Sequence, residues 1–181
     1  MPAPGVLTIG HSTRARAEFL ALLAEFGATT LVDVRRFPGS RRYPHFGGPA
    51  LAGSLAGIGI GYAHEPDLGG RRDPLPASVN TAWRVAAFRG YADHMASPEF
   101  RAALERVMAL SQAGRPAIMC AEAVPWRCHR QLIADTLVSR GMAVRHILGP
   151  GQERAHELNP SARPGPEGVL VYPATAQRRL I

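Results

Sequence analysis

Short apolar runs alternate along the chain with longer segments in which apolar residues recur every three or four positions. A run of four to eight apolar or β-branched residues favours a strand, whereas the longer spacing favours an amphipathic helix. Glycine and proline mark where many of these segments end. We predict strands at residues 6–10, 30–35, 60–64, 116–120, 144–148 and 169–172, and helices at residues 19–26, 49–57, 81–95, 99–113 and 129–140.

The helix at 99–113 carries the clearest start and stop signals. Ser97 is predicted to be its N-cap, Pro98 takes the first helical position, and Gly114 closes it. Predicted strands and helices alternate over most of the chain, which is typical of βαβ units. We therefore predict a three-layer α/β fold, in which a mostly parallel sheet carries helices on both faces.

The length of 181 residues is sufficient for one domain with a full core, so we expect residues 1–181 to form a single domain. Residues 149–168 are rich in proline, glycine and charge, and we expect an extended connection there that leads to an edge strand at 169–172. Hydrophobic residues make up 46% and charged residues 19% of the chain, as in globular proteins. Neither the first residues nor the weakly charged stretch 47–63 resembles a signal peptide or a membrane span, so we expect a cytoplasmic protein without a membrane partner.

The formal net charge is +7, and all 21 basic residues are arginine. Catalysis by a lysine amine is thereby excluded. Arginine presents a planar set of donors that suits phosphate and carboxylate groups, which favours an anionic small molecule or nucleotide as partner. Nucleic acid is the second candidate partner, because the arginines are spread along the chain and are not interleaved with aromatic residues.

Residues 118–130 concentrate chemically active side chains at a predicted strand-to-helix crossover. Both cysteines of the chain lie here, separated by seven residues, together with Glu122 and His129. In open α/β sheets ligands bind at such crossovers, and a helix start with nearby arginines lowers the pKa of a thiol. Cys120 is therefore a candidate nucleophile or redox thiol, although a buried cysteine also packs as a small apolar residue.

Polar residues follow several other predicted strands, and in a parallel sheet these strand ends share one rim. Each residue alone has an ordinary structural explanation, such as an ion pair between Asp33 and Arg35, so only their shared position favours a site. The candidate catalytic residues are Cys120, Glu122, His129 and Asp33, and the candidate ligand-binding residues are His11, Ser12, Arg35, Ser40, Arg41, Gly69, Gly70, Arg127, Cys128, Arg130, His146 and His156.

Zinc is the only metal that the residue types suggest, through Cys120, Glu122, Cys128 and His129. The spacing does not match paired zinc ligands from two places in the chain, so we predict no metal site and no cofactor and favour zinc less than the metal-free alternatives. The loop also lacks the spacing of a phosphatase loop, since six residues, not five, separate Cys120 from Arg127.

Several motifs in sequence order resemble the domain of unknown function 488 family, over nearly the whole chain. They are residues 8–12, residues 31–35 with Pro38 and Ser40, residues 62–70, residues 119–122 with 128–130, and His146 with residues 156–158. The resemblance implies a compact α/β protein whose motif residues form the site, and it implies no particular activity.

A fainter likeness is to rhodanese domains, through residues 31–35 and 117–149. It departs from them at the loop after Cys120, where Glu122 adds a negative charge and Pro125 and Trp126 add bulk. Our leading hypothesis is an enzyme acting on a phosphate-bearing or nucleotide-like ligand, with the thiol or the carboxylates Asp33 and Glu122 as the reacting groups. The alternatives are a rhodanese-like sulfurtransferase using Cys120 and a non-enzymatic nucleic-acid-binding module.

Overall fold

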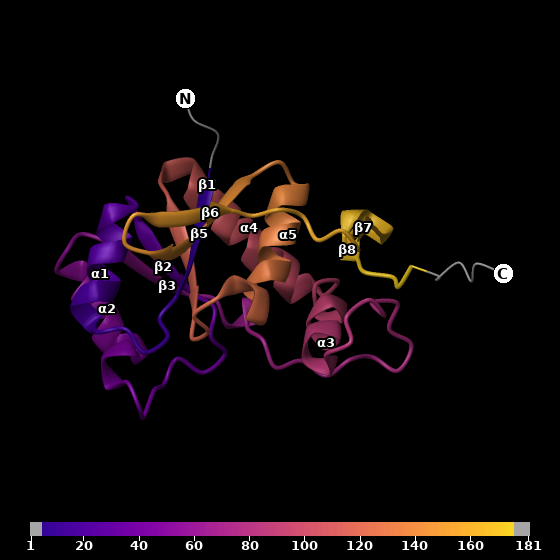
Figure 1. Ribbon diagram of the computed structural model, residues 1–181, viewed down its shortest axis with the longest axis horizontal. Helices are drawn as coiled ribbons and strands as arrows, with labels where there is room; N and C mark the ends of the chain where they lie inside the picture. The colour runs from indigo at the N-terminus through magenta and orange to yellow at the C-terminus, as the bar shows by residue number, and fades with distance from the viewer. Residues whose placement is uncertain (1–4, 176–181) are drawn as a thin grey trace.

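The computed structural model describes residues 5–175 and contains a six-stranded sheet flanked by helices (Figure 1). The strands are β1 (Gly5–Gly10), β2 (Thr30–Asp33), β3 (Gly61–His64), β4 (Pro116–Cys120), β5 (Ala143–Gly149), β6 (Gln152–Ala155), β7 (Arg163–Pro164) and β8 (Leu170–Val171). The helices are α1 (Arg16–Glu25), α2 (Gly48–Ala56), α3 (Ala86–His94), α4 (Pro98–Ala113) and α5 (Arg130–Ser139), and the short 3₁₀ helices are η1 (Pro44–Phe46), η2 (Pro66–Leu68), η3 (Pro125–Arg127) and η4 (Pro166–Gly168).

The strand order in the main sheet is β3-β2-β4-β1-β5-β6. Strands β1 to β5 are parallel, and β6 is antiparallel to β5. The three-layer, mostly parallel α/β fold predicted from the sequence is confirmed. Because β1, β2 and β4 are adjacent and parallel, the loops that follow them meet at one edge of the sheet.

Side chains alternate between the two faces of the sheet and build one apolar cluster on each. Leu7 and Ile9 of β1 point into the cluster formed with α1 and α2, whereas Val6 points into the cluster formed with α3, α4 and α5. In Figure 1, α1 and α2 lie on one side of the sheet and α4 and α5 on the other. Because both faces of the sheet are buried, residues that point to either face are apolar, and a buried strand appears in the sequence as a continuous apolar run.

The start of α4 follows its sequence signals. The hydroxyl of Ser97 accepts a hydrogen bond from the backbone N–H of Phe100 at 3.2 Å, and Pro98 occupies the first helical position.

In the described part of the chain, none of the helices is long and apolar enough to cross a membrane.

Two segments differ from the sequence prediction. The helix expected at 81–95 begins only at Ala86, because residues 80–82 form hydrogen bonds with the segment around Tyr172 instead. The N–H of Ala82 donates to the carbonyl of Tyr172, and the N–H of Tyr172 donates to the side chain of Asn80. The edge strand of the main sheet is β6, inside the stretch expected as a connection, and β8 pairs only with β7 in a separate two-stranded sheet. The strand β6 reads Gln-Glu-Arg-Ala, so it gives no apolar signal.

Candidate functional site

A cavity of about 670 Å³ opens where the loops after β1, β2 and β4 meet. Its walls come from four places in the chain that are distant in sequence. The lining residues are His11, Ser12, Thr13, Arg35, Arg36, Phe37, Gly39, Ser40, Arg42, Tyr43, Gly70, Arg71, Ala121, Glu122, Ala123 and His129. We call this cavity the arginine pocket.

The arginine pocket is strongly basic. Of the described residues that line it, four are arginines, Arg35, Arg36, Arg42 and Arg71, and one, Glu122, is a carboxylate. Guanidinium groups in a concave site attract anions and can bind phosphate oxygens in pairs. The cavity therefore suits a ligand with more than one negative charge.

Asp33 holds one of these arginines in place. Its Oδ1 accepts from Arg35 Nε at 2.8 Å, and its Oδ2 accepts from Arg35 Nη2 at 2.6 Å and from the Tyr62 hydroxyl at 2.8 Å. Burial, together with the hydrogen bond to Asp33, raises the pKa of Tyr62, so this hydroxyl stays protonated. Asp33 is fully buried and does not line the pocket, so its position is that of a support for Arg35.

His11 is a neutral histidine on the pocket wall. Its Nδ1 lies 2.9 Å from the carbonyl of Ser12 and its Nε2 lies 3.4 Å from Arg35 Nη1, which assigns the proton to Nδ1. Burial lowers the pKa of His11 to about 4, and the charge of Arg35 adds to the effect while the hydrogen bond to Ser12 opposes it. The unprotonated nitrogen of this ring, Nε2, faces Arg35.

Two lining residues have unusual backbone conformations. Ser12 has a φ of 48° and Arg71 a φ of 61°, in the left-handed region that side chains rarely adopt. Such strain concentrates at ligand sites, where the surrounding structure holds it in place. Gly10 lies two residues before Ser12. A Cβ atom at position 10 would lie 1.7 Å from the carbonyl oxygen of Glu122, so only glycine allows the loops after β1 and β4 to approach each other this closely.

His129 is the second neutral histidine of the pocket. Burial lowers its pKa to about 3, and the charges of Arg130 and Arg72 contribute. Its Nε2 is buried and has no hydrogen-bond partner among the described residues. Gly70 packs against the ring, since a Cβ there would lie 2.9 Å from His129 Nδ1. The ring therefore forms part of the pocket wall, while its unpaired nitrogen is shielded from solvent.

Both cysteines lie beneath this wall, where neither lines the pocket. Their sulfur atoms are 2.6 Å apart, neither cysteine is in a disulfide bond, and each has 3% of its surface exposed. Burial raises the pKa of Cys120, but the hydrogen bond from Cys128, the charge of Arg130 and the N–H of Glu122 outweigh burial and lower it to about 6. Burial and the neighbouring Cys120 raise the pKa of Cys128 well above its usual value.

Arg130 is fully buried under the pocket floor. Its Nε donates to Cys120 Sγ at 3.1 Å, its Nη1 to Thr8 Oγ1 at 3.0 Å, and its Nη2 to the carbonyl of Glu122 at 2.7 Å. All its bonds are thus internal, and they tie the loop after β4 to β1.

The remaining predicted residues fall into three groups. Ser40 and Gly70 line the pocket. Gly69 packs against Arg36, because a Cβ atom at position 69 would lie 2.4 Å from Arg36 Cγ. Arg41 and Arg127 are exposed and line neither the arginine pocket nor the second cavity. His146 and His156 line that second cavity.

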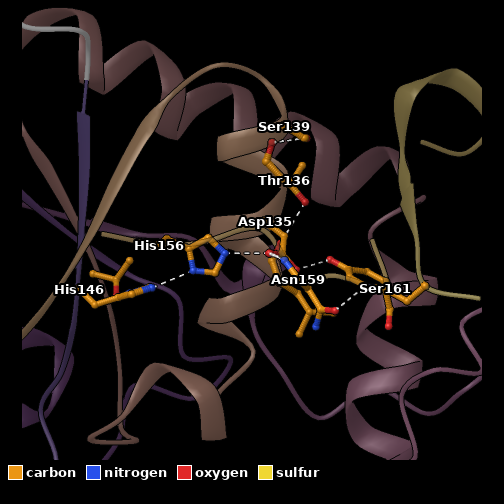
Figure 2. A network of polar contacts seen from close by, with 10 residues as sticks. Asp135, Thr136, Ser139, His146, His156, Asn159 and Ser161 are labelled. Atoms are coloured by element: carbon orange, nitrogen blue, oxygen red, sulfur yellow. Dashed lines mark hydrogen bonds and ion pairs between the residues drawn. The ribbon is translucent and has the colours of Figure 1, made fainter. Parts of the chain in front are cut away.

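The second cavity measures about 330 Å³ and lies beside α5 and β6. His146 Nε2 lies 2.9 Å from His156 Nδ1, and His156 Nε2 lies 2.8 Å from Asp135 Oδ1 (Figure 2). Thr8 connects this row to Arg130, because its hydroxyl accepts from Arg130 and lies 2.7 Å from His146 Nδ1. We call the chain from Arg130 through Thr8, His146 and His156 to Asp135 the histidine relay.

The sequence prediction did not include Arg36, Arg42 and Arg71 among the site residues. A signal for them was present, because Arg36, Arg42 and Arg71 each belong to a pair of arginines in a loop rich in glycine, proline or aromatic residues. Thr8 belongs to the family-like motif 8–12 but was not among the candidate ligand-binding residues. Asp135 was not predicted, and nothing in its sequence surroundings marks it as a partner of His156.

Among residues 5–175 there is no group of three or more His, Cys, Asp or Glu side chains placed to hold a metal ion.

Comparison with known proteins gives one match. The model of the family described as domain of unknown function DUF488 matches residues 15–137, which is more than half of the chain. No curated protein and no solved structure matches significantly. The family match includes the loops of the arginine pocket after β2 and β4, and the chain belongs to the DUF488 family.

Proposed function

We propose that the arginine pocket binds a phosphate-bearing, nucleotide-like ligand and that the protein is an enzyme acting on it. The observation that carries this proposal is the set of four arginines around a cavity with a single lining carboxylate. Charge-assisted hydrogen bonds from guanidinium to phosphate are among the stronger polar contacts in proteins. A volume of about 670 Å³ also lies in the range of small-molecule and cofactor sites.

Glu122 is the residue we assign to acid–base chemistry. It is exposed to the pocket, whereas Asp33 is buried and fully bonded. In a hydrolytic step, Glu122 takes a proton from water as the water attacks the ligand, and the arginines stabilise the charge that develops on the phosphate or leaving group. The neutral rings of His11 and His129 line the pocket and carry no positive charge at neutral pH.

Sulfur transfer by Cys120 is less well supported by this geometry, because the sulfur lies beneath the pocket wall. Binding of nucleic acid alone is also less well supported, because the four arginines of the pocket surround a cavity. Thiosulfate-to-cyanide transfer that Cys120→Ser abolishes would favour the first alternative. Binding of arbitrary DNA or RNA with a steep salt dependence would favour the second.

The binding step is tested by titrating the full chain with inorganic phosphate, a nucleoside monophosphate and a nucleoside triphosphate in a calorimeter. We expect saturable binding of at least one, weakened about tenfold or more by Arg42→Gln or Arg71→Gln, because each removes a charge-assisted contact worth roughly 1.5–3 kcal/mol. Arg84→Gln is the matched control, since Arg84 is exposed and lies outside the pocket. Absence of binding by all three probes, or equal weakening in the control, would contradict the proposal.

The catalytic step is tested separately with Glu122→Gln. We expect this variant to keep ligand binding and to lose hydrolysis of the bound ligand. Hydrolysis at the unaltered rate would remove Glu122 from the mechanism while leaving the binding proposal intact.

A further inference from the structure

The two sulfur atoms under the arginine pocket face each other directly. They are 2.6 Å apart, and an S–S bond of about 2.05 Å requires only a small further approach. They come from two elements, the end of β4 and the residue after η3, so the 121–127 loop spans the distance between them. No rearrangement of the sheet is needed to join them.

The charge of Arg130 identifies the state of Cys120. Arg130 is fully buried, and among residues 5–175 no carboxylate forms an ion pair with it. A buried charge is stable only when it is paired, and Cys120 Sγ, 3.1 Å from Arg130 Nε, is the group that can supply the opposite charge. Cys120 is therefore a thiolate paired with Arg130.

Cys128 has the complementary role. Its sulfur contacts the Cys120 sulfur and also accepts from the backbone N–H of Arg130 at 3.4 Å. A second full negative charge beside Cys120 is opposed by repulsion. Cys128 therefore keeps its proton and acts as a hydrogen-bond donor to the Cys120 thiolate. One nucleophilic sulfur and one protonated sulfur in contact form an attacking and a resolving pair.

We propose that Cys120 and Cys128 form a redox centre, which hydrogen peroxide converts from a dithiol to an intramolecular disulfide. The Cys120 thiolate attacks one peroxide oxygen, the O–O bond breaks, and hydroxide leaves, which gives a sulfenic acid on Cys120. Cys128 then loses its proton as its sulfur attacks Cys120 Sγ; the S–O bond breaks and the hydroxide leaves with that proton as water. The two thiols lose two electrons in total, and the peroxide is reduced to water and hydroxide.

The burial of the pair restricts the oxidant. Each cysteine has 3% of its surface exposed, so a small peroxide is favoured over a bulky disulfide such as oxidised glutathione. We expect oxidation by peroxide to be at least tenfold faster than oxidation by the same concentration of oxidised glutathione.

Oxidation also changes the pocket wall. A disulfide carries no negative charge, so Arg130 loses its anionic partner while its Nη2 still binds the carbonyl of Glu122. The uncompensated charge is expected to loosen the loop that carries Glu122 and Ala123. This redox step is independent of which ligand the arginine pocket binds.

The experiment treats the folded full-length chain with hydrogen peroxide, removes the oxidant, and unfolds the protein in N-ethylmaleimide for intact mass analysis. We expect untreated protein to gain two labels, and treated protein to gain none and to weigh two hydrogens less. Peptide mapping should join Cys120 to Cys128, and a reducing agent should restore both labels. Two labels after treatment, or a disulfide between two chains, would overturn the proposal.

Two variants separate the roles of the sulfurs. In Cys128→Ser, oxidation should stop at a sulfenic acid on Cys120 that dimedone traps. In Cys120→Ser, peroxide consumption should fall at least tenfold, and consumption at the wild-type rate would overturn the assignment of Cys120 as the attacking thiolate. Circular dichroism of each variant checks that it is folded, and the result on the unaltered chain decides the proposal if a variant is not.

Discussion

His146 Nε2 donates to His156 Nδ1 at 2.9 Å, and this contact has a single consistent direction. For a neutral His156 ring, the Asp135 carboxylate, which can only accept, leaves Nδ1 of His156 to accept from His146 Nε2, and Nδ1 of His146 to accept from the Thr8 hydroxyl, whose oxygen also accepts from Arg130. His156 in turn carries its proton on Nε2 and donates it to Asp135. The histidine relay thus runs from a guanidinium to a carboxylate with every proton placed by its neighbours.

Asp135→Asn is predicted to destabilise the protein. Asp135 accepts from His156 Nε2, from the Asn159 N–H and from the Tyr172 hydroxyl, and an amide would turn an N–H group toward one of these donors. We expect a loss of about 2–4 kcal/mol in the free energy of unfolding, measured in urea. Asp73→Asn, at an exposed position, should stay within about 0.5 kcal/mol, and similar losses in both variants would argue against the directed relay.

Mild acid is predicted to destabilise the fold through its buried histidines. Burial lowers the pKa of His11 to about 4 and that of His129 and His146 to about 3, whereas all three take up a proton near pH 6.5 in the unfolded chain. Below pH 6.5 the unfolded state binds more protons, so stability falls by roughly 1.4 kcal/mol per pH unit for each histidine and is fully present above that pH.

Urea denaturation at pH 7.5, 6.0 and 5.0 measures this dependence above the range in which ordinary carboxyl groups titrate. His146→Gln removes one of these histidines, so the slope of the free energy of unfolding against pH should become shallower by about 1.4 kcal/mol per pH unit. A free energy of unfolding that is equal at pH 7.5 and 5.0 would show that these histidines are not buried as neutral rings.

The thiolate on Cys120 is predicted to titrate near pH 6, far below an ordinary thiol. Its population should therefore fall roughly tenfold between pH 7 and pH 5, as followed by the ultraviolet absorbance of the thiolate in reduced protein. Cys128→Ala removes the S–H donor and should move the midpoint to higher pH. In Cys120→Ser the low-pH transition should vanish, and a transition that survives would belong to another group.

Two glycine substitutions are predicted to have opposite effects. Gly10→Ala places a methyl group 1.7 Å from the carbonyl oxygen of Glu122, and because backbone cannot move as easily as a side chain, we expect a loss of about 3 kcal/mol or more in the free energy of unfolding. Gly53→Ala lies on an exposed face of α2 with open space around it, and should stabilise by about 0.5–1 kcal/mol. Thermal denaturation of both variants provides the comparison, and a stable Gly10→Ala variant would disprove the close approach of the two loops.

The fold was predictable because the buried strands carry continuous apolar runs and the helices carry Pro, Gly and Ser signals at their ends. Ser97 at the start of α4 illustrates this, since its capping bond is local in sequence. The exposed edge strand β6 was not predictable, because its side chains face solvent and show no apolar alternation. The start of α3 was not predictable either, since it depends on contacts with Tyr172, far along the chain.

For the candidate site, the sequence located the strand ends but not the burial of individual side chains. Arg130 was predicted to bind the ligand, yet it lies under the pocket floor, because Thr8 and Cys120 from adjacent strands supply its partners. His146 was expected at the rim, but it pairs with Thr8 in the middle of β5 and therefore faces the second cavity. Hydrogen bonding between residues that are distant in sequence depends on the assembled sheet and cannot be inferred from spacing.

The position of β1 in the sheet determines when the protein can fold during synthesis. Although β1 is the first described element to leave the ribosome, its neighbours are β4 and β5, and the bond from Arg130 to Thr8 spans 122 residues. The apolar N-terminal strand has to wait for the last third of the chain before it can pair, and such long-range pairing is slow. Nascent chains that stall before residue 116 therefore expose an unpaired strand, which makes them the species most prone to aggregate and most dependent on chaperones.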